Sequence, residues 1–266
     1  MTRCAGPSLF AGIASFLSAA TRGRFRLIIG YEASHTGDLA RDGAAIIEGL
    51  GGHALLMPRA LPAPLTAFSV RMVMADGALY IRSSGEALIY LGGRAVDRSR
   101  EGALASEAEL SLIDEAAAAV SDEAAAAVSD EAALPRAEGG WECVGEGMIG
   151  AYVDRAVSRI SSLSDATHVP TPVSVEDPTG LLISLLERLG VPIDEAGAGL
   201  SLRVRCEGRT LCSSLSEEQV RTALGEALAT SPAIPAGRGL YCVDPAFVMD
   251  ADAISAGAAL ALLAPR

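Results

Sequence analysis

The 266-residue sequence is poor in aromatic residues, histidines and paired cysteines, and each shortage excludes a class of protein. Aromatic residues make up only 4% of the chain while 50% is hydrophobic, so a core must be built from Leu, Val, Ile and Ala. The five cysteines are scattered without a Cys-x-x-Cys pair, which argues against a disulfide framework and a structural zinc site. The three histidines fall in separate segments, without metal-ligand spacing. A reducing, cytoplasmic location is the simplest expectation.

Basic residues are also scarce, since 21 Lys and Arg face 33 Asp and Glu for a formal net charge of −12. A surface this acidic repels phosphate backbones and anionic lipid heads, so we expect neither nucleic acid nor a membrane as partner. The glycines form no nucleotide-binding pattern.

One apolar stretch, residues 9–20, has two interpretations. It resembles the core of a signal peptide, but Leu9, Ile13, Phe16 and Leu17 fall on one helical face, which favours an amphipathic helix. No other stretch is long and apolar enough to span a bilayer.

The first hundred residues alternate predicted strands and helices. The strands are expected at residues 26–31, 53–57 and 77–81, and the helices at 38–50 and 61–74. This βαβαβ order predicts a mostly parallel sheet with right-handed crossovers.

The stretch GALYIRSSGEALIYLGG, residues 77–93, holds two apolar runs of strand type separated by RSSG. Reactive groups in open α/β sheets lie at strand ends, so Ser83 or Ser84 is either a nucleophile or a turn residue.

The rest of the chain is richer in helix signals. Residues 114–133 repeat the octad Asp-Glu-Ala-Ala-Ala-Ala-Val-Ser, which predicts a connecting helix without a coiled-coil seam, because eight residues match neither a heptad nor an eleven-residue repeat. Further helices are expected over residues 146–160, from Asp177-Pro178 to Gly190, and over 217–229. Ser216 and Gln219 have the spacing of a capping box for the last of these helices.

Several stretches, in the same order along the chain, resemble the phosphohexomutase (phosphoglucomutase/phosphomannomutase) family. The matching stretches include LIIGYEASHTGDLARD, LLMPRALPAPLTAFSVR, GALYIRSSG, TPVSVEDPTGLLISLLERLG and LYCVDPAFVMDADAISAG. The resemblance implies an α/β fold with a mixed, mostly parallel sheet and flanking helices in the first domain, followed by reduced α/β remnants of a second and third phosphohexomutase domain. The expected segments are a first domain (1–100), an Ala-rich helical connector (101–140), a reduced second domain (141–199) and a partial third domain (200–266), with the fourth domain absent.

The family's functional residues match this sequence only in part. A family serine carries the phosphoryl group passed to and from a hexose phosphate, and the resemblance places Ser83 there, with Ser84 where a histidine belongs. Three aspartates of the family hold magnesium, and the resemblance assigns only Asp194 to the first of these positions. Other expected side chains are replaced, as shown by Ser34 and Gly199 (each for an arginine), Ala196 and Ala198 (for aspartates), and Ala236 and Gly237 (for the glutamates of a sugar-binding loop).

These replacements bear on activity because phosphoryl transfer depends on positioning and on cations that neutralise phosphoryl oxygens. Magnesium needs several oxygen ligands, so we expect Asp194 by itself not to bind it, although the family uses it as cofactor. The resemblance therefore implies an isomerase (an intramolecular phosphotransferase acting on hexose phosphates) that is impaired or inactive here. Three hypotheses stay open: an active mutase, a non-catalytic relative that binds a protein partner, and a remnant without a role.

A last expectation concerns a protein interface. The shortened second domain predicts that apolar Leu200, Leu202, Val204 and residues 260–263 lack covering elements. Exposed apolar area of this kind predicts self-association or a protein partner.

Overall fold

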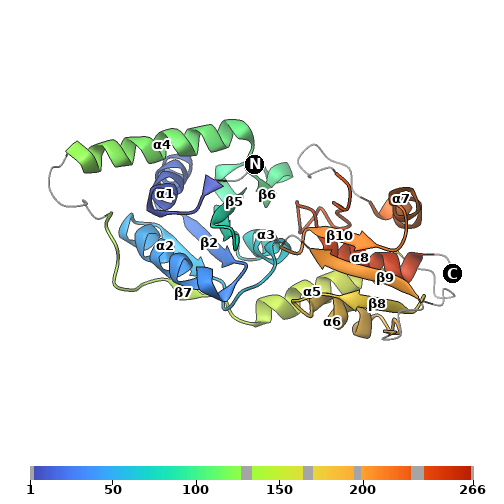
Figure 1. The fold of residues 1–266 in the computed structure, drawn as a ribbon. Coiled ribbons are helices and arrows are strands. Elements are labelled where there is room, and N and C mark those ends of the chain that lie inside the picture. The colour runs from blue at the N-terminus through green and yellow to red at the C-terminus, as the bar shows by residue number, and fades with distance from the viewer. Residues whose placement is uncertain are drawn as a thin grey trace. The chain divides into compact units, whose positions relative to one another are not determined.

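The computed structural model divides the chain into two compact units, Met1–Glu146 (unit 1) and Gly147–Arg266 (unit 2). Each unit has its own sheet and helices (Figure 1). The structure describes residues 3–126, 134–163, 170–194, 199–205, 207–228 and 237–264. The finer division into remnants of three domains stays a prediction.

Unit 1 is built on a seven-stranded mixed sheet: six strands follow the order β1-β5-β4-β2-β3-β7, and the seventh, β6, pairs with β5. The strands are β1 (Arg3–Cys4), β2 (Arg26–Tyr31), β3 (His53–Leu56), β4 (Gly77–Ile81), β5 (Glu86–Leu91), β6 (Ala103–Leu104) and β7 (Glu142–Cys143). Strands β2, β3, β4 and β7 run parallel, whereas β5 pairs antiparallel with β4. The predicted βαβαβ order is therefore confirmed for β2, β3 and β4, which pair in parallel. The pairings β1–β5, β4–β5 and β5–β6 are antiparallel, so the sheet is mixed and not mostly parallel as predicted.

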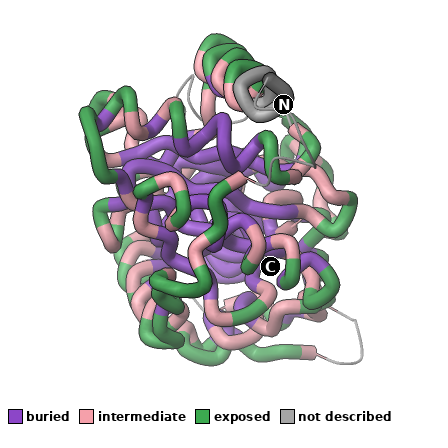
Figure 2. Tube along the Cα trace, turned by 90° about the vertical axis from the view of Figure 1, so that its left-hand side faces the viewer, coloured by how far each residue is buried: buried purple, intermediate pink, exposed green. Residues whose placement is uncertain are grey.

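Helices cover both faces of this sheet. They are α1 (Pro7–Thr21), α2 (Gly37–Gly49), α3 (Ala63–Met72) and α4 (Glu107–Ala126). Helices α1 and α2 pack with Ile29 of β2 in one hydrophobic core, and α4 packs on α1. The next residue, Gly30, turns to the other face, where α3 brings Thr66 against it. Burial on both faces explains why these strands are almost continuously apolar, and Figure 2 shows such buried segments in purple.

The amino-terminal apolar stretch forms helix α1, as the amphipathic interpretation predicts. Leu9, Ile13 and Leu17 are buried in the core of unit 1, whereas Phe16 is half-buried. Among the described residues, no helix combines the length and the apolar character that crossing a membrane requires.

Unit 2 contains a three-stranded sheet, β10-β9-β8, in which β8 and β9 are parallel and β10 is an antiparallel edge strand. The elements are α5 (Gly147–Ser161), β8 (Val173–Glu176), α6 (Leu181–Arg188), β9 (Leu200–Arg205), β10 (Thr210–Ser213), α7 (Glu217–Leu224) and α8 (Ala253–Leu263). Helix α8 is buried along nearly its whole length and contacts α5, α6, α7, β9 and β10. The predicted capping box of Ser216 and Gln219 is present at the start of α7.

The expectation of exposed apolar side chains in unit 2 is wrong. Leu200, Leu202 and Val204 alternate with exposed residues along β9, and each is at most 6% exposed because α8 covers their face of the sheet. In α8 itself, residues 260–262 are buried and only Leu263 is half-buried. The argument for self-association or a partner drawn from these residues therefore no longer holds.

Two predicted helix boundaries also differ. Helix α6 begins at Leu181, later than the predicted start at Asp177-Pro178. Asp177 Oδ1 accepts the N–H and the hydroxyl of Thr179, which forms a turn before the helix. Its Oδ2 accepts the N–H of Leu182 in the first turn of α6. Helix α7 ends at Leu224, because Gly225 adopts a positive φ of 45° and a short 3-10 turn follows.

A buried carboxylate, Asp76, lies at the amino ends of β2 and β4. Asp76 is 2% exposed, and its two oxygens accept the backbone N–H of Arg26 at 3.0 Å and both backbone and side-chain N–H groups of Arg94 at 3.0 to 3.1 Å. Burial raises the pKa of Asp76, but these hydrogen bonds from Arg94 and Arg26 outweigh burial, so that the pKa is lowered overall.

We expect Asp76→Asn to lower the free energy of unfolding of unit 1 at neutral pH by about 2 kcal/mol, because charge-assisted hydrogen bonds are lost. Since the folded pKa lies below the unfolded value of about 3.9, this stabilisation is present above about pH 4 and lost as the pH falls. Urea unfolding followed by the fluorescence of Trp141, the one tryptophan, which packs on the core of unit 1, measures it. Asp38→Asn is the control, since the Asp38 side chain is 90% exposed. A variant as stable as the parent at neutral pH would contradict this role.

Candidate functional site

The candidate site of unit 1 lies at the carboxyl ends of β2 and β4, which are neighbours in the sheet. Tyr31 pairs with Ile81 at the last position of both strands, and the N–H of Glu32 donates to the carbonyl of Ile81 at 2.9 Å. The chain continues from β2 through Glu32 into α2, whereas β4 continues into the turn to β5. Ligands of open α/β sheets bind at such neighbouring carboxyl ends.

Ser83 lies in this turn. The N–H of Gly85 donates to the carbonyl of Arg82 at 3.0 Å, which closes the turn, and Gly85 has a φ of 82° that only glycine adopts at little cost. The hairpin of β4 and β5 thus fixes the position of Ser83 through main-chain geometry. Ser83 and Ser84 are both exposed.

One carboxylate oxygen holds Ser83 from across the sheet edge. Glu32 Oε2 accepts the hydroxyl of Ser83 at 2.7 Å and its backbone N–H at 2.6 Å. A carboxylate within hydrogen-bond distance of a hydroxyl has the geometry of a general base, but the second hydrogen bond equally makes it a turn-stabilising acceptor.

His35 also approaches the serine turn, at a different atom. Its Nε2 lies 3.3 Å from the carbonyl oxygen of Ser83, so the imidazole can donate to the main chain. The side chain replaces neither the histidine expected at position 84 nor a base on the hydroxyl, because its contact is to the carbonyl. From the sequence alone, Glu32 and His35 were not identified as residues of this site. Both follow β2 as Ser83 follows β4, and this shared position after neighbouring strands could have indicated them.

Arg82, which precedes Ser83 in the sequence, pairs with a second carboxylate. Arg82 Nη1 donates to Glu86 Oε2 at 2.6 Å, and the hydroxyl of Ser84 donates to the same oxygen at 3.2 Å. The carboxylates of Glu32 and Glu86 thus face the single guanidinium of Arg82 in this turn. This surrounding field opposes an incoming dianion.

Asp194, the predicted metal ligand, belongs to unit 2. It is half-buried and follows the bridge between Ile193 and Val173, and its N–H donates to the carbonyl of Val173 at 2.7 Å. Among the described residues, no group of three His, Cys, Asp or Glu side chains is placed to hold a metal ion. Residues 196 and 198 lie outside the described residues, so the expectation about magnesium stays a prediction.

The structure gives a reason why Gly199 does not match the arginine of the resembled family. A Cβ atom at Gly199 would lie 2.1 Å from the carbonyl oxygen of Pro172, so no larger residue fits there without a main-chain shift. An arginine at this position, as the resemblance would require, is incompatible with this local packing. In the segment that the resemblance aligns with a sugar-binding loop, Gly237 forms a bridge with Leu240, and Ala236 lies outside the described residues.

The buried polar residues of unit 2 serve the fold. The segment between Tyr241 and α8 is fixed by Asp244, which pairs with Arg155 at 2.6 Å, by Asp250, which pairs with Arg209, and by Asp252, the N-cap of α8. The hydroxyl of Tyr152 donates to Asp252 at 2.9 Å. Burial raises the pKa of Asp252 and outweighs its hydrogen bonds.

Comparisons with known proteins found similarity to solved structures but not to sequence families or curated proteins. No family model matches the sequence, and the search of curated proteins found no match. Among solved structures, a Thermus thermophilus protein named as a phosphomannomutase is similar with a TM-score of 0.62 and 12% sequence identity, over 97% of this chain and 76% of that chain. At this identity the likeness concerns the fold. The chain therefore has a mixed α/β fold like that of this phosphomannomutase structure.

Proposed function

We propose that this chain is a phosphohexomutase-like protein in which phosphoryl transfer at Ser83 has been lost. The observation that supports the proposal is the double hydrogen bond from the hydroxyl and the N–H of Ser83 to one oxygen of Glu32. In this interpretation Ser83 is a turn residue whose ancestral counterpart carried the phosphoryl group. A hexose phosphate as ligand and magnesium as the family's cofactor are implied by the resemblance, and our prediction remains that this chain does not bind magnesium. A protein partner stays an open hypothesis.

Electrostatics explains why this arrangement disfavours a phosphoserine. A phosphoryl group on Ser83 Oγ would add about two negative charges next to a carboxylate that now lies 2.7 Å from that oxygen. The backbone N–H of Ser83, which could otherwise donate to a phosphate oxygen, is already bonded to Glu32. The repulsion between Glu32 and a phosphoryl group on Ser83 is not balanced by Arg82, the arginine of this turn, because Arg82 already pairs with Glu86.

The same contact favours a second candidate, an active mutase. As a general base, Glu32 would take the hydroxyl proton while Ser83 Oγ attacks phosphorus. The Oγ–P bond would form, the bond between phosphorus and the sugar oxygen would break, and that oxygen would take up a proton. We rank this candidate second because the step also needs cations to neutralise the transferred group.

Phosphorylation of Ser83 distinguishes the two candidates. After incubation of the full chain with glucose 1,6-bisphosphate and magnesium, we expect intact-mass measurement to show no phosphate-sized adduct, and Ser83→Ala to behave identically. A stable adduct that maps to Ser83 would overturn the proposal.

The variant Glu32→Gln separates repulsion from base catalysis. It keeps the shape of the side chain but removes its charge. If repulsion excludes the phosphoryl group, any trace of adduct should increase in this variant, whereas loss of a general base should decrease it. Turnover of glucose 1-phosphate and mannose 1-phosphate, measured in parallel, is expected to stay at background.

A further inference from the structure

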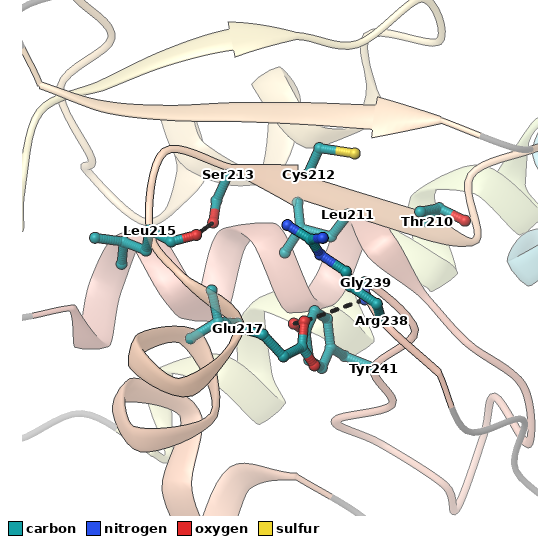
Figure 3. A pocket seen from close by; sticks show the side chains of 10 residues that line it. Thr210, Leu211, Cys212, Ser213, Leu215, Glu217, Arg238, Gly239 and Tyr241 are labelled. Carbon is teal, nitrogen blue, oxygen red and sulfur yellow. Dashed lines mark hydrogen bonds between the residues drawn. The ribbon is translucent and has the colours of Figure 1, made fainter.

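A cavity of about 320 Å³ lies within unit 2 and shares no residue with the serine turn of unit 1. It is bordered by the edge strand β10, by the start of α7 and by the segment that leads into Tyr241 (Figure 3). Its polar side chains come from Thr210, Cys212, Ser213, Glu217, Arg238 and Tyr241. A cavity of this size, with a few polar groups among apolar ones, suits a small metabolite.

Glu217 supplies a fixed negative charge to this cavity. Its Oε2 accepts the hydroxyl of Tyr241 at 2.6 Å and the N–H of Gly239 at 3.4 Å, and its Oε1 accepts Arg221 Nε at 2.9 Å. Burial raises the pKa of Glu217, but these hydrogen bonds outweigh burial and lower it overall, so the carboxylate is ionised at neutral pH. A carboxylate accepts about four hydrogen bonds, which leaves capacity for one more donor. The side chain is 32% exposed and therefore accessible.

Arg238 supplies a positive charge on the same cavity. In Figure 3 its side chain points toward β10, whereas Glu217 points toward Tyr241. Within the described part of the chain, Arg238 makes no ion pair or hydrogen bond, with Glu217 or any other residue. The cavity thus carries the Glu217 carboxylate, which pairs with Arg221, and separately the guanidinium of Arg238, which does not pair with Glu217.

The edge of β10 offers main-chain groups to the same space. Leu211 donates its N–H away from β9, to the carbonyl of Gly239 at 2.8 Å. Because main-chain groups alternate in direction along an antiparallel strand, Ser213, two residues later, also directs its N–H and carbonyl away from β9. Ser213 lines the cavity, so its main-chain groups lie on the side of β10 that faces away from β9 and borders the cavity.

We propose that this cavity binds a small zwitterion of the α-amino acid class. The carboxylate of the ligand lies at the guanidinium of Arg238, and its ammonium group donates to Glu217. The cavity's opposite charges match a ligand that carries both, and a free amino acid is small enough for the volume. A phosphate dianion fits less well, because the ionised Glu217 carboxylate can only accept hydrogen bonds and has no proton to donate to it. The proposal is independent of phosphoryl transfer at Ser83.

The thiol of Cys212 allows a direct test on the full chain. Cys212 is exposed and lines the cavity, Cys4 and Cys143 are exposed in unit 1, and Cys242 is buried with its pKa raised by burial to about 12. Each of the common L-amino acids is added at millimolar concentration before a brief pulse of iodoacetamide, and alkylation is measured peptide by peptide. We expect at least one amino acid to slow alkylation of Cys212 while Cys4 and Cys143 react unchanged.

The ligand's two charges are then tested separately. The amide and the N-acetyl derivative of the protecting amino acid are each expected to bind about tenfold more weakly, as are Arg238→Gln and Glu217→Gln with the parent amino acid. Arg205→Gln is the matched control, because Arg205 is an exposed arginine of the same unit that does not line the cavity. Glu217→Gln should leave binding of the corresponding des-amino acid unchanged.

Several outcomes would overturn the proposal. They are protection by no amino acid, protection by the amide or the N-acetyl derivative as strong as that by the parent amino acid, protection that survives Arg238→Gln, and stronger protection by inorganic phosphate than by any amino acid. Circular dichroism of each variant shows whether a loss of binding comes from a loss of folding.

Discussion

Replacing Arg209 by Met is expected to lower the free energy of unfolding of unit 2 by about 3–5 kcal/mol, the largest effect that we expect from a single substitution in this protein. Asp250 is fully buried, and Arg209 donates to both of its oxygens at 2.8 Å. Without the guanidinium, a carboxylate is left buried without its partner charge. Removing one partner of a buried pair therefore costs far more than the pair itself contributes.

Hydrogen exchange in α8 measures this effect on the full chain. The N–H of Ala253, the first residue of α8, donates to the carbonyl of Gly208, next to Arg209, at 3.0 Å, so α8 reports on the integrity of the pair. The double variant Arg209→Met/Asp250→Leu should regain most of the lost stability, because it removes both charges. Arg203→Met is the control, since Arg203 pairs with Glu176 at the surface, where we expect a change of about 0.5 kcal/mol. Equal effects of Arg203→Met and Arg209→Met would contradict the prediction.

Adding one methyl group at Gly30 is expected to lower the stability of unit 1 by about 2 kcal/mol. Gly30 lies within β2, and a Cβ atom there would be 2.2 Å from Thr66 Oγ1 and 3.1 Å from the ring of Tyr80. Both neighbours are fully buried, so they have little room to move away. Urea unfolding followed by Trp141 fluorescence measures the change for Gly30→Ala.

Thr66 provides the internal test of this explanation. Among the described residues its buried Oγ1 has no hydrogen-bond partner, so removing it sacrifices no hydrogen bond. The double variant Gly30→Ala/Thr66→Ala should therefore recover part of the loss, because the closest clashing atom is gone. Gly139→Ala is the control, since nothing lies within 4 Å of a Cβ atom there. Additive losses in the double variant would show that the clash with Thr66 is not the cause.

The sequence by itself determined the elements that depend on neighbouring residues. The apolar run of β2, the capping box of Ser216 and Gln219, and the strand–turn–strand stretch around Ser83 were all read correctly, because each depends on residues only a few positions apart. The βαβαβ order likewise predicted the parallel pairing of β2 with β3 and β4. For the candidate site, Ser83 was placed at a strand end from sequence, but its catalytic competence was not decided there.

Only the tertiary structure decided what faces these elements. It brought Glu32 to Ser83 across 51 residues of sequence, joined Arg209 to Asp250 across 41, and covered Leu202 of β9 with α8. The cavity with Glu217 and Arg238 likewise combines a strand edge, a helix start and a later segment. The physical reason is that a hydrogen-bonded turn or cap acts within a few residues, whereas burial and charge pairing depend on which distant segments fold together, and local patterns do not specify that.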